Sequence, residues 1–342
     1  MVEEPIKTNE RTEEGFFRKY GWLIAVICGV LSLLFLFGTI LQFKQKIPDG
    51  EDVKKVITAV NLTYFFSHSH SYNWTIFVTI GLLIGGSICV VLQRFKKGFA
   101  SAASMLFFLV IPMMALEAEF FQYNSNIEYL SSVELSWGAM CTIAFAVIAA
   151  VVCLSVEFSD NPIITRQITE DGILIAAAFI LNLIRIYKVP GQGGSINFQM
   201  LPLFIIALRH GPAHGLICGG ILYGLITCLT DGYGFASYPF DYLIGFGSVM
   251  VMGFFRKFIF SENQNGYNLK GELFLLLAGV LATFIRFAGS FASSMVVYGV
   301  TFKEALIYNC IYIPVSGLIS LVVIMAAYGP LAKVNNLFPA KK

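Results

Sequence analysis

The chain has 342 residues, of which 57% are hydrophobic and only 13% are charged. Soluble domains carry about 25% charged residues, so this composition excludes a soluble globular enzyme and a disordered chain. The net charge of +2 leaves no basic face for a nucleic acid. The remaining class is an all-α polytopic membrane protein, because lipid requires every backbone polar group to be paired within its own segment.

Ten apolar stretches predict about ten transmembrane helices, since a span needs about 20 residues. The sixth stretch is short and the seventh follows Gly211-Pro212, so we expect a tight helical hairpin there. The polar stretch 157–171 separates an N-terminal four-helix domain, residues 1–160, from a C-terminal six-helix domain, residues 161–342. The ten stretches are 21–42, 74–93, 98–116, 136–156, 171–187, 196–209, 213–230, 239–255, 271–296 and 305–329.

The distribution of Lys and Arg predicts the orientation of these helices. With the N-terminus in the cytoplasm, the inside segments hold about twice as many basic residues as the outside segments. The segment 117–137 has four Glu and no basic residue, which suits the outside. We therefore predict a multi-pass protein of the bacterial plasma membrane with both termini in the cytoplasm and no cleavable signal peptide.

Cysteine and histidine give no metal motif at this stage. All seven cysteines lie in or beside apolar runs, without a CxxC pattern or a Cys/His pair at metal spacing. Free buried thiols are therefore expected, and no metal site is predicted. His68 and His70 could bind a metal ion, but a solvated loop is the preferred interpretation. No ionisable residue is expected well inside a span of the N-terminal half.

The C-terminal half has polar residues at membrane depth. Asp241 lies one or two residues into a predicted helix, beside Tyr238 and Tyr242. A carboxylate at this depth is costly, so it is usually functional or paired. Aromatic rings and a carboxylate together suit an organic cation. Two structural alternatives remain open, namely that Asp241 caps its own helix or pairs with Arg286.

Arg286 and two runs of small residues also have alternative interpretations. Arg286 could pair with Asp241, bind a carboxylate or phosphate, or extend toward the membrane surface. The small residues of 289–294 either permit close helix packing or leave room for a ligand. Gly172 and Ala176 lie four residues apart, hence on one helix face, which suits a neighbouring helix of this chain or of a partner.

Residues 168–330 resemble the substrate-binding S component of energy-coupling-factor (ECF) vitamin transporters, in particular the thiamine-specific branch. The resemblance implies a six-helix bundle with a vitamin near the outer face, under the loop between its first two helices. It also implies a transmembrane coupling subunit and two ATPases that use ATP; this chain itself has no Walker A pattern. The matching stretches are 174–184, 193–202, 207–212, 220–225, 238–243, 253–256 and 308–312.

The resemblance also implies a ligand site. The family's acidic residue followed by Tyr aligns with Asp241-Tyr242, where Asp replaces the usual Glu. The family's ligand-contacting His aligns with Ser290, and a Trp that the first loop contributes in some members has no counterpart, since Gly193 stands there. Gly172 and Ala176 align with the family's small-residue motif for docking on the coupling subunit. The predicted substrate-binding residues are Asp241, Tyr242, Tyr238, Ser290, Ser294, Tyr298, Asn309 and Gln199.

The sequence therefore predicts a vitamin-binding transporter subunit, with thiamine as the transported ligand, no cofactor of its own and the loop 191–194 as its gate. The same scaffold with another vitamin or a thiamine precursor is the alternative, because Ser290 and Gly193 depart from the family pattern. An intramembrane enzyme is disfavoured, since HExxH, GxSxG and paired acids within a span are absent. A membrane scaffold without ligand is the third possibility. Residues 1–160 have no assigned role.

Overall fold

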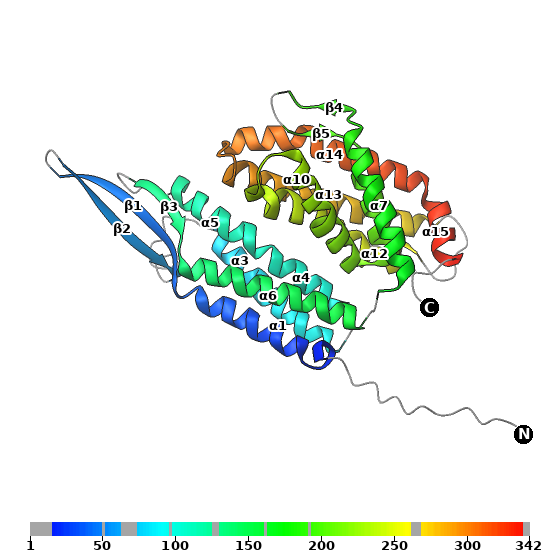
Figure 1. Cartoon of the computed structure of the whole chain (residues 1–342), viewed down its shortest axis with the longest axis horizontal. Coiled ribbons are helices and arrows are strands. Elements are labelled where there is room, and N and C mark those ends of the chain that lie inside the picture. Colours follow the sequence, from blue (N-terminus) through cyan, green and yellow to red (C-terminus); the bar gives the residue numbers. More distant parts are fainter. Residues whose placement is uncertain are drawn as a thin grey trace, which may run out of the picture.

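The computed structural model describes residues 16–49, 52–62, 74–95, 98–124, 130–160, 163–190, 193–260 and 268–337. They form two helical bundles that lie side by side, joined where α6 passes into α7 (Figure 1). The all-α polytopic class is confirmed, because eight helical segments are long and apolar enough to cross a membrane. The remaining two predicted spans correspond to α7 and to the short apolar helix α8.

The N-terminal bundle is held together by close contacts between small and apolar residues. Ser32 and Thr142 each donate a hydroxyl to the other's backbone carbonyl, at 3.0 and 3.2 Å, where α1 crosses α6. This exchange satisfies two buried hydroxyls within the bundle, as an apolar environment requires. Its helices are α1 (Phe16–Phe35), α3 (Trp74–Gln93), α4 (Phe99–Phe108), α5 (Val110–Asn124) and α6 (Trp137–Asp160).

A three-stranded antiparallel sheet at one end of this bundle was not predicted. Strands β1 (Thr39–Asp49), β2 (Asp52–Asn61) and β3 (Leu130–Leu135) pair in the order β2-β1-β3. The first helix therefore ends at Phe35, and not at residue 42 as the apolar run suggested. Gly38 breaks the helix, and the β-branched and aromatic residues that follow alternate with polar ones, which favours a strand.

The expectation that the N-terminal spans contain no ionisable residue is wrong for Glu117. This residue lies within α5 and is fully buried. The hydroxyl of Thr75 on α3 donates a hydrogen bond to its carboxylate. The sequence placed Glu117 just beyond the third span, but the helix continues for seven more residues to Asn124, which carries the carboxylate into the bundle.

The C-terminal bundle contains two stretches of π-helix, η1 and η3, within otherwise α-helical segments. Gly211 joins α8 to α9 with a φ of 102°, and Pro212 begins α9, so the predicted hairpin turn is present. The elements are α7 (Thr165–Leu183), β4 (Tyr187–Lys188), β5 (Ser195–Ile196), α8 (Met200–His210), α9 (Pro212–His214), η1 (Gly215–Tyr223), α10 (Gly224–Asp231), η2 (Phe235–Ser237), η3 (Tyr238–Ile244), α11 (Gly245–Gly247), α12 (Met250–Ile259), α13 (Leu269–Val296), α14 (Phe302–Ala326) and α15 (Tyr328–Leu337).

Glycines allow the central helices of this bundle to touch through their backbones. A Cβ on Gly220 of η1 would lie 2.5 Å from the Leu243 carbonyl oxygen of η3. A Cβ on Gly289 of α13 would lie 2.7 Å from the Phe240 carbonyl oxygen. Only glycine permits these approaches, and π-helical turns are frequent at functional sites. In this region the helices therefore contact one another through their backbones and not through interlocking side chains.

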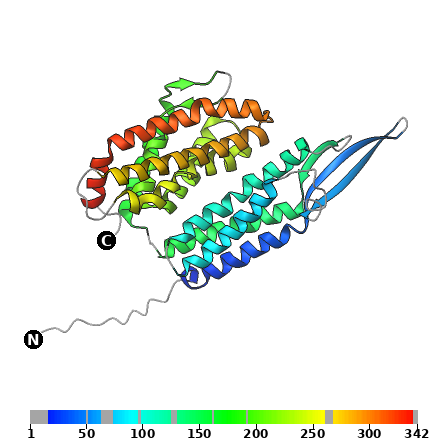
Figure 2. The ribbon, with the colours of Figure 1, turned by 180° about the vertical axis from the view of Figure 1, so that it is seen from behind.

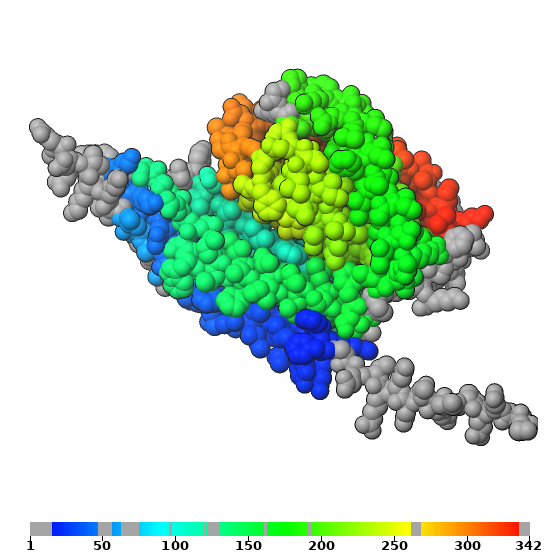
Figure 3. Space-filling view, viewed as in Figure 1, coloured from blue at the N-terminus to red at the C-terminus, as the bar shows by residue number. Residues whose placement is uncertain are grey.

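The two bundles pack against each other. Leu116 of α5 is buried with Phe240 of η3 and Ala292 of α13. The space-filling view shows the halves in contact along their length (Figure 3). The turn between α13 and α14 points toward the same end as the β1–β3 sheet, whereas the start of α1 and α15 lie at the other end (Figures 1 and 2).

Candidate functional site: a polar cavity in the C-terminal bundle

A cavity of about 330 Å³ opens among α7, η3, α13 and α14. This volume is in the range of sites for small organic ligands. Its wall combines two carboxylates, two guanidinium groups and five tyrosines. The charged and aromatic lining residues are Asp231, Asp241, Arg185, Arg286, Tyr233, Tyr242, Tyr298, Tyr308, Tyr312 and Phe246.

Asp241 faces the cavity and neither caps its helix nor forms an ion pair with Arg286. Its carboxylate accepts a hydrogen bond from the Ser293 hydroxyl of α13 at 2.5 Å. No side-chain cap is formed at the start of η3. Among the described side chains, no ion pair within 4.0 Å joins Asp241 to Arg286. Both structural alternatives for this acid are therefore unsupported.

Asp231 is a second acid in the wall, at the end of α10. The Tyr242 hydroxyl donates a hydrogen bond to it at 3.3 Å. The carboxylates of Asp231 and Asp241 thus line one cavity, with Tyr242 beside both in the lining. Arg185 and Arg286 in the same wall balance these charges overall, so the two acids supply a local negative charge for the cationic part of a ligand.

Arg286 is buried and does not extend to the membrane surface. Its side chain lines the cavity, and its Cζ atom lies 4.7 Å from the centroid of the Phe246 ring. The residue is 5% exposed, and its Nη1 atom has no hydrogen-bond partner within the described part of the chain. A buried donor of this kind is costly unless a ligand or water satisfies it.

Neutral polar groups form the rest of the wall. The side-chain amide of Asn309 donates to the Ser294 hydroxyl at 2.9 Å, and the Tyr312 hydroxyl donates to Oδ1 of Asn309 at 3.3 Å. The side chain of Gln199 is fixed by Tyr223, whose hydroxyl donates a hydrogen bond to Oε1 of Gln199 at 2.6 Å. These hydrogen bonds fix the orientation of each amide before any ligand binds.

The loop between α7 and α8 closes against the tyrosines. A Cβ on Gly193 would lie 2.4 Å from the ring of Tyr233, and one on Gly194 would lie 2.7 Å from the ring of Tyr312. The space beside Gly193 is therefore occupied by Tyr233, from the loop between α10 and η2. Burial raises the pKa of Tyr298, which lies in the α13–α14 turn, so its phenol stays neutral at physiological pH.

Seven of the eight predicted ligand residues line this cavity, and Tyr238 does not. The Tyr238 hydroxyl donates to the Gly220 carbonyl oxygen at 3.3 Å, and its ring stacks on Phe235 at 5.1 Å. The seven lining residues are Asp241, Tyr242, Ser290, Ser294, Tyr298, Asn309 and Gln199.

Several lining residues were missed by the sequence analysis. Asp231 and Tyr233 belong to the polar, aromatic stretch that contains Asp241, and Tyr308 and Tyr312 flank Asn309 on α14. Helical spacing could have identified Tyr312, since it lies one turn from Tyr308. Arg185 and Asn182 gave no signal.

The other predicted features are located as follows. Gly172 and Ala176 are exposed on α7, and a Cβ on Gly172 would meet no atom within 4 Å. This result excludes intrachain packing at Gly172 within the described residues. His68 and His70 lie outside the described residues, as do Gly191 and Gln192 of the predicted gate.

Comparison with known proteins gives two matches. Residues 168–336 match the family model described as "Thiamine transporter protein (Thia_YuaJ)". The C-terminal half of the chain is therefore similar to this thiamine transporter family. The chain is also 29% identical over 140 residues to the thiamine transporter ThiT of Bacillus subtilis (strain 168), a match that covers 39% of this chain and 71% of that protein. No solved structure matches the chain.

The half that matches the family contains the whole cavity, since every lining residue falls between Asn182 and Tyr312. The resemblance seen in the sequence is confirmed over nearly the same range. Residues 1–167, with most of the N-terminal bundle, lie outside the family match.

Proposed function

We propose that the chain is the substrate-binding membrane subunit of a thiamine uptake transporter and that thiamine binds in the C-terminal cavity. The observation that carries this proposal is a cavity of about 330 Å³ that combines two carboxylates with five tyrosines inside the half that matches the thiamine transporter family. Thiamine joins a permanently cationic thiazolium ring to a neutral aminopyrimidine. Ring faces and carboxylates attract the first, and fixed amides and hydroxyls suit the second.

The lining residues divide into three roles in this proposal. Asp241 and Asp231 supply the counter-charge for the thiazolium ring. Tyr242 and Tyr298 supply ring faces on which it stacks. The aminopyrimidine and the hydroxyethyl group take hydrogen bonds from neutral groups, namely Asn309, Ser290, Ser294 and Gln199. Tyr238 positions η3 from behind the cavity wall.

The ligand enters from the outer face of the plasma membrane in this proposal, with both termini in the cytoplasm. The charge distribution of the loops favours this orientation. The α13–α14 turn and the loop between α7 and α8 both contribute to the cavity wall, and the contact of Gly193 and Gly194 with tyrosine rings makes this loop the gate. The gate must leave the tyrosines for thiamine to enter.

The chain performs no covalent chemistry in this proposal, and transport requires partners. An ECF-type coupling subunit and two cytoplasmic ATPases would supply the energy of ATP hydrolysis. Gly172 and Ala176 form the docking surface on α7, because they are exposed and allow another helix to approach closely.

A ligand screen on the purified full-length protein tests the proposal. We expect thiamine to raise the melting temperature more than its pyrimidine precursor, riboflavin or other vitamins, since a ligand that binds only the folded state stabilises it. A larger shift with a different vitamin or precursor would support the alternative that Ser290 and Gly193 suggest. If no vitamin raises the melting temperature, the result would support the scaffold alternative. The open cavity argues against that alternative.

A further inference from the structure

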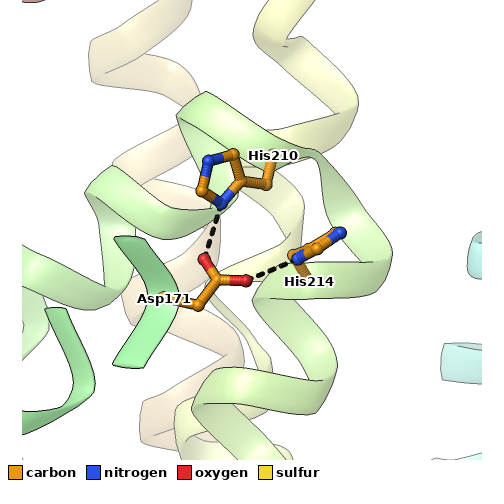
Figure 4. A group of neighbouring side chains, drawn as sticks. All are labelled: Asp171, His210 and His214. Atoms are coloured by element: carbon orange, nitrogen blue, oxygen red, sulfur yellow. Dashed lines mark hydrogen bonds and ion pairs between the residues drawn. The ribbon is translucent and has the colours of Figure 1, made fainter. Parts of the chain in front are cut away.

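A second group of polar residues lies outside the cavity, at the opposite end of the C-terminal bundle. The Asp171 carboxylate contacts two histidines, with Oδ1 2.6 Å from Nδ1 of His210 and Oδ2 2.6 Å from Nδ1 of His214 (Figure 4). All three residues are buried. Their three candidate ligand atoms lie within 4.8 Å of one another. Two imidazole nitrogens thus contact the two oxygens of one carboxylate.

The local fold explains why these residues meet. His210 ends α8 and His214 ends α9, and the turn at Gly211-Pro212 keeps both histidines on one side of the corner, four residues apart. Asp171 reaches them from α7, which packs beside α8. The separation in sequence of 39 and 43 residues made this cluster invisible to a search for local metal motifs.

The outer contacts of the cluster point to a metal site. Nε2 of His210, the nitrogen that faces away from Asp171, lies 3.0 Å from Oε2 of Glu170. Arg209 holds the same Glu170 oxygen through Nε and Nη2, at 2.9 and 2.8 Å. A metal-bound histidine characteristically donates its second N–H to a carboxylate, which fixes its tautomer and its orientation. His210 has that arrangement.

We propose that Asp171, His210 and His214 form a binding site for a divalent first-row metal ion of the zinc class. Two imidazoles and one carboxylate suit Zn²⁺, Co²⁺ or Ni²⁺ better than Mg²⁺ or Ca²⁺, which prefer oxygen ligands. The ion takes the place of the protons that Asp171 now shares with the two histidines. Because ligand atoms around tetrahedral zinc lie about 3.3 Å apart, the 2.6 Å contacts must open by less than 1 Å.

The three residues leave one position of a tetrahedral site open. A water molecule at this position would complete the site.

The position of the site defines its structural role. The ion would join the first half of α7 to the α8–α9 corner, and the residue after Asp171 is Gly172 of the exposed small-residue face. The His214 ring also packs edge-on against Phe158 of α6, with centroids 5.8 Å apart. The site therefore lies where α7, the corner and the N-terminal bundle meet, and none of its three residues lines the cavity.

Zinc binding to the purified full-length protein tests this inference. The result of this experiment does not depend on which ligand the protein transports. The chain has four histidines, so a variant with His68→Ala and His70→Ala and a histidine-free affinity tag leaves His210 and His214 as its only imidazoles. After chelation and dialysis, we expect this variant to bind one equivalent of Zn²⁺. Co²⁺ should give the intense visible absorption of a tetrahedral site, and Zn²⁺ should raise the melting temperature.

Two further measurements keep the result decisive. Adding Asp171→Asn or His214→Ala to the same variant should weaken Zn²⁺ binding at least tenfold. Because such variants could fail to fold, protection of His210 and His214 from diethylpyrocarbonate by Zn²⁺ is measured on the His68→Ala/His70→Ala protein itself. Absence of bound Zn²⁺ and of protection in that protein, or unchanged affinity in folded Asp171→Asn, would overturn the proposal and leave Asp171 as a hydrogen-bonding bridge between two histidines.

Discussion

The N-terminal and C-terminal bundles solve the same problem, a polytopic fold in lipid, in different ways. In the N-terminal bundle the helices are regular and several buried polar groups pair across helices, as Ser32 does with Thr142 and Thr75 with Glu117, although the Ser101 and Ser104 hydroxyls of α4 have no partner within the described residues. In the C-terminal bundle two π-helical stretches and backbone contacts at glycine surround a cavity. There Arg286 keeps a buried donor atom without a partner in the described residues.

This difference indicates that the N-terminal bundle is built for stable packing and the C-terminal bundle for binding a ligand. The N-terminal bundle gains its stability from packing and, in the part of the chain that the structure describes, leaves only small hydroxyls without a partner, whereas the C-terminal bundle leaves a charged group of its cavity wall without one. A bundle that binds a ligand must leave charged and aromatic groups unsatisfied until the ligand arrives, and it then needs rigid supports around them. Glycine contacts between η1, η3 and α13 provide such supports, since helices in backbone contact cannot collapse further into the cavity.

The largest expected effect concerns these glycine contacts. Gly289→Leu would force a side chain against the Phe240 carbonyl oxygen, which lies 2.7 Å from the Cβ position. Overpacking against backbone should lower the melting temperature by roughly 10 °C or more, or prevent recovery of folded protein. The matched variant in the N-terminal bundle is Gly81→Leu, because a Cβ on Gly81 would meet no atom within 4 Å. The melting temperature of the Gly81→Leu variant should equal that of the unmodified protein. An equal fall in melting temperature in both variants would contradict the comparison.

The contrast also explains how much of the fold could be predicted. Apolar length and charge were sufficient for ten helices, because the bilayer imposes both requirements locally. The β1–β3 sheet was missed because the apolar run continued through Gly38 into β1. Its third strand, β3, lies about 90 residues further along the chain, but β2 follows β1 directly, so the pairing of these two strands was a local signal that was not used. Glu117 was misplaced because a buried carboxylate inside a helix depends on a partner, Thr75, that no local pattern identifies.

Part of the candidate site was predicted from the sequence. The family resemblance pointed to Asp241, Tyr298 and Asn309, and the structure places all three in one cavity. It did not point to Tyr233, whose ring fills the space beside Gly193, because the two residues belong to different loops that are 40 residues apart in the sequence. Tyr238 was assigned from its neighbours in sequence, but the π-helical turn directs its ring behind the wall.

The next effect in size is on ligand affinity. Asp241→Asn should weaken thiamine binding more than about tenfold, or roughly 1.4 kcal/mol, because the counter-charge of the thiazolium ring is lost. Isothermal titration of the purified protein measures the change. Glu117→Gln is the matched N-terminal variant, since it removes a buried carboxylate that does not line the cavity. It should alter the melting temperature and leave affinity unchanged; unchanged affinity in Asp241→Asn would remove this acid from the proposed site.

A smaller change in affinity is expected when one aromatic ring is removed. Tyr298 lies in the α13–α14 turn and is 46% exposed, so its ring contributes the modest attraction of an accessible cation–π contact. Tyr298→Leu should weaken thiamine binding about threefold to fivefold, equivalent to roughly 1 kcal/mol or less. Tyr20→Leu, at an equally exposed tyrosine of the N-terminal bundle, serves as the control. If both variants bind thiamine like the unmodified protein, Tyr298 does not contact the ligand.

The smallest expected effect separates the cavity wall from its support. Tyr238→Phe removes one hydroxyl, whose hydrogen bond to the Gly220 carbonyl oxygen joins η3 to η1, and keeps the ring stacked on Phe235. One such hydrogen bond contributes about 1 kcal/mol to stability, so the melting temperature should fall by a few degrees. The thiamine Kd should change less than about twofold, because the hydroxyl lies outside the lining. A larger change in Kd at constant melting temperature would place Tyr238 in the site after all and show that η3 turns when the ligand binds.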